Sequence, residues 1–140
     1  MAQSIRVPYS ASGNMPQAIS LMPRLSLKLH LGNTFTEVNG LIDSGASVSV
    51  LPYSVGATLG ANWDDQPQLA PLGGNLSVIE VRALAVTAYH PDLTNSDGVE
   101  LLFAWARTDN SPILFGQINF FLQFDVCFFR QEQIFEISRR

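Results

Sequence analysis

The sequence predicts a mainly β fold, and three observations support this class. Short runs of alternating or β-branched residues recur along the chain, and turn-forming residues separate them. These runs do not alternate with long helical segments, as they would in a parallel α/β fold. The chain has 140 residues, the ordinary size of one domain. We therefore expect a single mainly β domain with one or two short helices.

The first regular strand is expected at residues 25–31, where apolar and polar side chains alternate. Residues 1–22 are rich in Ser, Ala, Gly, Pro and Gln and show no sustained period, so they predict an N-terminal extension or arm. The domain itself is expected to span residues 23–140. Gly32-Asn33 predicts a hairpin turn that leads the chain back toward Asp43.

The rest of the chain continues this pattern of short elements. Eight of its nine phenylalanines lie from Phe103 onward, which predicts that the C-terminal third supplies much of the core or of a subunit interface. Gly73-Gly74 predicts a flexible hairpin tip between two strand-like arms. Further strands are expected at residues 68–72, 76–81, 82–89, 99–106, 112–116, 125–129 and 134–137, and short helices at residues 53–59 and 117–124.

Composition excludes several classes of function. Only 14% of the residues are charged and 46% are hydrophobic, so we expect the chain to bury part of its surface against a protein partner. The net charge is −4 and Lys28 is the only lysine, which argues against nucleic acid as a partner. No run approaches the roughly 20 apolar residues of a membrane span. We expect a cytoplasmic protein with no membrane partner and no signal peptide.

Cysteine and histidine give little sign of metal or redox chemistry. Cys127 stands in an apolar run, which predicts a small buried hydrophobic residue rather than a reactive thiol. His30 is expected on the exposed side of its strand, and His90 lies in a predicted turn. Two isolated histidines without a Cys or carboxylate cluster do not form a zinc pattern, so we expect no metal and no cofactor.

Asp43 is the most informative residue of the chain. Leu41-Ile42 is expected to end a buried strand, Ser44-Gly45 to form a tight turn, and Val48 to begin the apolar side of a second short strand. A carboxylate in such a place is costly unless it is hydrogen-bonded, paired or functional. Asp43 therefore either holds the turn by accepting backbone N–H bonds or carries the chemistry of the protein. A serine hydrolase based on Ser44 is disfavoured, because Ile42 stands where a nucleophile elbow has glycine.

Three segments resemble the retropepsins, the retroviral-type aspartic proteases and their cellular relatives. They are the strand end and turn from Leu41 to Ala46, the tip Leu72-Gly73-Gly74, and the strand from Ile113 to Gly116, in this order. The resemblance covers roughly residues 23–137 and suggests a cellular, microbial member of the family. It implies a closed β-barrel-like acid protease fold that is active as a symmetric homodimer, with one Asp43 from each chain.

The resemblance also implies a reaction and the residues that carry it. Two Asp43 carboxylates would share one proton, activate a water between them and hydrolyse a peptide bond, while Ser44 would fix the paired loops and Gly45 would leave room for the substrate. The substrate is implied to be an extended polypeptide with hydrophobic residues beside the cut. The residues implied to contact it are Ala46, Val50, Leu72, Gly73, Gly74 and Leu114.

Two positions depart from the retroviral pattern. Retroviral members often carry an Asp where Ser47 stands and an Arg where Gln117 stands, so a stabilising charged pair is absent and a neutral substitute is expected. The same sequence also fits a second function. A retropepsin fold that binds peptides or partners without cleaving them would retain the same motifs.

Overall fold

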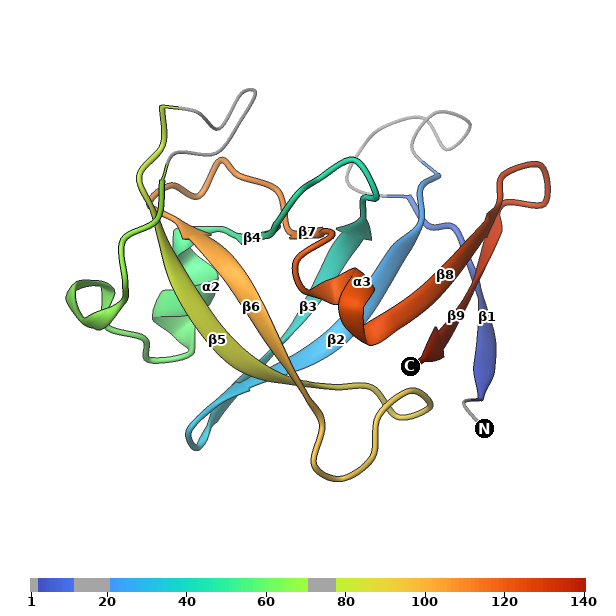
Figure 1. Ribbon diagram of the computed structural model, residues 1–140, viewed down its shortest axis with the longest axis horizontal. Helices are drawn as coiled ribbons and strands as arrows, with labels where there is room; N and C mark the ends of the chain where they lie inside the picture. The colour runs from blue at the N-terminus through green and yellow to red at the C-terminus, as the bar shows by residue number, and fades with distance from the viewer. Residues whose placement is uncertain (1–2, 12–20, 71–77) are drawn as a thin grey trace.

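The computed structural model describes residues 3–11, 21–70 and 78–140, and Figure 1 shows a mainly β fold, as the sequence predicts. The strands are β1 (Ser4–Pro8), β2 (Arg24–Leu31), β3 (Thr34–Ile42), β4 (Ser49–Leu51), β5 (Val81–Tyr89), β6 (Val99–Ala106), β7 (Leu114–Phe115), β8 (Phe124–Phe129) and β9 (Ile134–Arg139). The helices are α2 (Tyr53–Thr58), the 3-10 helix η1 (Trp63–Asp65) and α3 (Phe120–Gln123). No helix among these residues is long and apolar enough to cross a membrane.

Six strands form a barrel in the order β2-β3-β7-β4-β6-β5. Two antiparallel hairpins, β2-β3 and β5-β6, supply its long strands, and a turn-forming segment joins the two strands of each. Apolar and polar residues alternate throughout β2, whereas buried and more exposed positions alternate along only parts of β3, β5 and β6. Strand β5 also pairs with β2, from Lys28 opposite Tyr89 to His30 opposite Thr87. This short pairing joins the two ends of the strand order.

Strand β7 lies between β3 and β4, parallel to the first and antiparallel to the second. Leu114 pairs with Leu41 on one side and with Val50 on the other. Because β3 and β7 run in the same direction, the segment that follows β3 and the segment that follows β7 leave the barrel side by side. The first of these segments begins with Asp43.

A second sheet, with the order β1-β9-β8, lies beside the barrel (Figure 1). Strand β1 comes from the expected N-terminal extension, and it pairs with β9 from Ser4 opposite Ser138 to Pro8 opposite Ile134. The first part of the extension is therefore an extended strand that is hydrogen-bonded to the C-terminal strand. Residues 12–20 of the extension lie outside the described residues.

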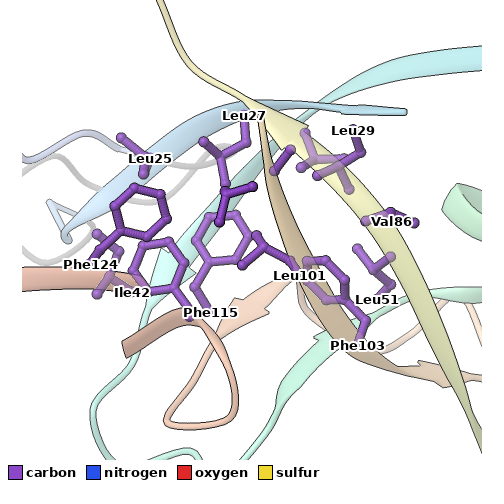
Figure 2. Close-up of a cluster of buried hydrophobic side chains, with 14 of the residues drawn as sticks. Leu25, Leu27, Leu29, Ile42, Leu51, Val86, Leu101, Phe103, Phe115 and Phe124 are labelled. Atoms are coloured by element: carbon purple, nitrogen blue, oxygen red, sulfur yellow. The ribbon is translucent and has the colours of Figure 1, made fainter. Parts of the chain in front are cut away.

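The core fills the barrel and continues beneath the second sheet. Figure 2 shows Leu25, Leu27 and Leu29 of β2 pointing into it, as the alternation of that strand requires. Burying each such side chain contributes about 1.5–3 kcal/mol to stability. The fully buried phenylalanines are Phe103, Phe115, Phe120, Phe124 and Phe135, which confirms that the C-terminal third supplies much of the core.

Cys127 corrects one expectation, because it is exposed rather than buried. Its strand β8 alternates, with Phe124 fully buried and Val126 packed against the core. Cys127 consequently points to the other side of the sheet, like Asp125. An apolar run of sequence did not reveal this alternation, since both faces of β8 carry apolar side chains.

Candidate functional site

Asp43 follows directly on β3 and is held by its own turn. Its backbone N–H donates to the carbonyl oxygen of Phe115 at 3.0 Å, which extends the β3–β7 pairing by one residue. The N–H of Gly45 donates to Asp43 Oδ1 at 2.9 Å, and the N–H of Ala46 donates to the Asp43 carbonyl oxygen at 3.2 Å. Oδ2 accepts no hydrogen bond from the described residues. The half-buried carboxylate thus has one oxygen fixed in an Asx turn and one oxygen available.

The segment after Asp43 runs beside the segment after β7. The N–H of Gln117 donates to the carbonyl oxygen of Ala46 at 2.9 Å, and the N–H of Ile118 donates to that of Ser47 at 3.0 Å. A Cβ on Gly116 would collide with the carbonyl oxygens of Val48 and Ala46. Only glycine allows the two backbones to approach this closely.

Two side chains complete this contact. Gln117 Nε2 donates to the carbonyl oxygen of Ser44 at 2.8 Å, so a neutral amide ties the Asp43 turn where retroviral members often have a charged pair. Ser49 Oγ accepts a hydrogen bond from the N–H of Gly116 at 2.9 Å, and Ser49 is only 1% exposed. Ser44 and Gly45 themselves are exposed. The turn is therefore anchored from beneath while its outer surface stays open.

Two solved structures are similar to this chain. A retropepsin-like aspartic protease from Rickettsia conorii matches with a TM-score of 0.64, covering 99% of this chain and 94% of that chain at 8% sequence identity. The fold is that of the retropepsin-like aspartic proteases. The EIAV protease, in complex with the inhibitor HBY-793, matches with a TM-score of 0.53, covering 74% of this chain and 88% of that chain at 19% identity. No protein-family model and no curated protein sequence matches the chain.

The resemblance noted in the sequence is thus confirmed as a retropepsin-like fold. Within this fold the structure brings Asp43, Ser44, Gly45 and Ala46 together in one turn, next to Leu114 of the neighbouring strand. Leu72, Gly73 and Gly74, the expected hairpin tip, lie outside the described residues. The arms that flank them are paired, since the N–H of Leu69 donates to the carbonyl oxygen of Val81 at 3.1 Å.

Val50, which is expected to contact the substrate, is buried in the single chain. It is only 2% exposed and packs with Val81, Ala104 and Ala106, while half-buried Leu114 covers the same small cluster. Val50 and the next residue of β4, Leu51, point to opposite sides of the sheet: Leu51 joins the core of the barrel, whereas Val50 joins this separate small cluster. An apolar hollow of about 30 Å³ lies close by instead, lined by Val48, Leu69, Leu102, Phe103, Ala104 and Ile118.

Sequence reasoning missed two residues that shape this region. Ser49 carried a signal, because a serine between two valines of a buried strand requires a hydrogen-bond partner. No pattern in the sequence indicated a role for Asn119. Its Oδ1 accepts a hydrogen bond from the N–H of Leu102 at 2.8 Å, and its Nδ2 donates to the carbonyl oxygen of Glu100 at 3.0 Å. This side chain therefore fixes the end of the β7–α3 segment against β6.

The described residues contain no group of three His, Cys, Asp or Glu side chains that is arranged to hold a metal ion. Asp43 also takes part in none of the ion pairs among them, which join Arg6 with Glu136, Arg82 and Arg107 with Glu80, and Arg140 with Asp125. The chemistry that this turn offers is that of a carboxylate with a free oxygen.

Proposed function

We propose that the protein is an aspartic endopeptidase that acts as a symmetric homodimer, with one Asp43 from each chain at the active site. The observation that carries this proposal is the Asp43 turn, which a retropepsin-like fold holds rigidly from beneath and leaves open above. One carboxylate in each chain is half of an acid–base pair. A two-fold axis beside the turn supplies the other half without any further motif.

The proposed reaction uses the two carboxylates in different protonation states. Two such groups a few ångströms apart do not both ionise readily, so the pair shares one proton. The ionised carboxylate accepts a proton from a water molecule as that water attacks the scissile carbonyl carbon, and the protonated carboxylate donates to the carbonyl oxygen. The carboxyl group that now carries the proton donates it to the amine nitrogen as the C–N bond breaks, while the other carboxylate takes a proton from a hydroxyl of the tetrahedral diol. The products are a carboxylic acid and an amine, and the pair again shares one proton.

The proposed substrate is an extended polypeptide segment with hydrophobic residues beside the cleaved bond. Ala46 and Leu114 border the turn, and the hollow near Ile118 adds apolar surface. Leu72, Gly73 and Gly74 are proposed to close over the substrate and to bond its backbone. Exposed Ser44 is proposed to contact the second copy and to fix the two turns relative to each other.

The direct test compares wild type with Asp43→Asn on a library of hydrophobic peptides. Losing the acid–base group is expected to lower kcat/KM by about 10²–10⁴-fold, because a positioned acid or base contributes that much. Asp97→Asn is the matched control, since Asp97 is an exposed carboxylate in a surface turn. Equal cleavage by Asp43→Asn and wild type would contradict the proposed mechanism.

The requirement for two copies has its own measurement. A single-chain tandem dimer that carries Asp43→Asn in one half should be as inactive as one that carries it in both halves. Sedimentation should show a dimer for the wild-type chain under the assay conditions. A well-formed dimer that binds peptides of the library but cleaves none would favour the second function, a peptide-binding module.

A further inference from the structure

The loop between β5 and β6 lies at the opposite end of the barrel from the end of β3, which Asp43 follows (Figure 1). Two adjoining hollows lie beside this loop. The first has a volume of about 400 Å³ and is lined by Lys28, Tyr89, His90, Pro91 and the turn of Asn95 and Ser96. The second, of about 420 Å³, shares the first four of these residues and is also lined by Glu37. Each is within the size range of small-ligand sites. Neither belongs to the Asp43 site.

The strand side of the first hollow is formed by Lys28 and Tyr89. Both contact a row of aromatic rings whose other members, His30 and Phe35, lie outside the hollow and hold them in place. His30 stacks on Phe35 with ring centres 5.3 Å apart, and it meets Tyr89 edge-on at 4.7 Å. The Lys28 ammonium lies 5.0 Å from the centre of the Phe35 ring. Backbone pairing sets this row, because His30 is opposite Phe35 and Lys28 is opposite Tyr89 in neighbouring ladders. The wall therefore exists before any ligand arrives.

The loop side is also formed in advance, by bonds within the loop. Thr94 Oγ1 accepts from the N–H of His90 at 3.1 Å and donates to the His90 carbonyl oxygen at 3.2 Å. Leu93, only 5% exposed, anchors the loop in the core. Asn95 closes the next turn, since its Oδ1 accepts from the N–H of Asp97 at 2.9 Å. A ligand would not have to order this loop on binding.

The polar groups of the first hollow are mainly donors. Lys28 takes part in no ion pair within the described residues, although Glu37 is its cross-strand neighbour. His90 Nδ1 accepts from the N–H of Asp92 at 3.1 Å, which leaves the ring proton on Nε2. Burial lowers the pKa of His90, so the ring is a neutral N–H donor at pH 7. No carboxylate lines this hollow.

We propose that the first hollow binds a small organic anion that contains a ring. Its carboxylate or phosphate group pairs with the Lys28 ammonium, and its ring lies against Tyr89 and Pro91. The donors of Asn95 and Ser96 bond the remaining oxygens of the anion. Glu37 lies opposite Lys28 in the β2–β3 pairing and lines the second hollow but not the first, so the anion is expected in the first hollow, because like charges repel.

The test is a titration of the full-length ¹⁵N-labelled protein, followed by NMR, with benzoate, phenyl phosphate, inorganic phosphate and the neutral analogue benzyl alcohol. A ring-bearing anion should give saturable amide shifts at Lys28 and in the loop from His90 to Ser96, with a Kd on the order of 1 mM. The two ring-bearing anions show whether carboxylate or phosphate is preferred. Inorganic phosphate lacks the ring and benzyl alcohol lacks the negative charge, so each should bind at least about tenfold more weakly.

Variants separate a specific site from general charge attraction. Lys28→Gln should weaken binding at least about tenfold, whereas Lys28→Arg should restore most of it. Arg6→Gln removes an exposed cation from the other sheet and should change nothing. The proposal is overturned if neither ring-bearing anion gives saturable shifts, if Lys28→Gln binds as wild type does, or if benzyl alcohol binds equally well. None of these readouts depends on proteolysis, so the proposed function is tested separately.

Discussion

The turn after β3 and the loop after β5 both leave the barrel at the end of a strand, but different parts of the chain hold them. The Asp43 turn has local hydrogen bonds from Gly45 and Ala46, and it is also tied to Phe115 and Gln117, which lie far away in the sequence. The loop after β5 is fixed by its own Thr94 and Asn95. The candidate active site therefore depends on long-range hydrogen bonds in addition to local ones, whereas the hydrogen bonds that shape the opposite loop are local, and Leu93 alone of its described residues anchors it in the core.

The largest effect is expected from Gly116→Ala. The new Cβ collides with the backbone carbonyls of Ala46 and Val48, which cannot rotate away as a side chain can. We expect a loss of about 3 kcal/mol in the free energy of unfolding, measured by urea denaturation. Gly32→Ala is the control, because its hairpin turn has a φ of +59° but open space around the new Cβ, and about 1 kcal/mol is expected there. Equal losses would mean that the two backbones are not tightly packed.

A smaller effect is expected from Ser49→Ala. The change leaves the N–H of Gly116 buried without an acceptor, which should cost about 2 kcal/mol. Amide hydrogen exchange should become faster in the Asp43 turn, because the segment that contains Gly116 also packs against that turn. Thr94→Val is the matched variant at the opposite end, where it removes two local hydrogen bonds and should speed exchange only in its own loop. Faster exchange in the Asp43 turn of Thr94→Val would contradict the proposed difference between the two ends.

The smallest effect concerns His90 and pH. Burial lowers the pKa of His90 below its ordinary value of 6.5, and this outweighs the opposite influence of Asp92. The unfolded chain then binds a proton more readily than the folded one, so stability falls as the pH drops through about 6.5 toward the folded pKa. Above that pH range His90 is neutral in both the folded and the unfolded chain, so it no longer makes stability depend on pH.

His90→Gln should remove this part of the pH dependence. Urea midpoints of wild type and variant, compared between about pH 8 and pH 5, should differ by a changing amount, with wild type losing more stability on acidification. A constant difference across the range would show that His90 does not contribute. The other histidine, His30, is present in both proteins and cancels in the comparison.

The sequence was sufficient for those features that follow from local pattern. Alternation predicted β2 to within a residue, a β-rich run predicted β6, and the phenylalanine distribution predicted the source of the core. The Asp43 turn was predictable because Asp-Ser-Gly after an apolar strand is typical of a tight turn. In contrast, the burial of Val50 in a cluster outside the barrel core and the exposure of Cys127 depend on strand register. Register is set by partners that local pattern does not reveal.

The contacts that hold the site were the least predictable part. The sequence singled out Gln117 as a neutral replacement, but its acceptor, the Ser44 carbonyl oxygen, is a backbone group with no sequence signature. The same applies to the contact between Ser49 and Gly116. Such contacts arise only after β7 has inserted between β3 and β4.

The side chain of Asn119 has a consequence for how copies of this chain behave in a crowded solution. Strand β6 pairs with β4 only from Phe103 to Trp105, so the preceding residues would offer unpaired backbone groups beside Leu102, which is 39% exposed. Asn119 occupies the N–H of Leu102 and the carbonyl oxygen of Glu100, as a neighbouring strand would. A strand of another molecule cannot pair with these backbone groups while the Asn119 carboxamide occupies them. This single side chain therefore protects the edge of β6 against aggregation.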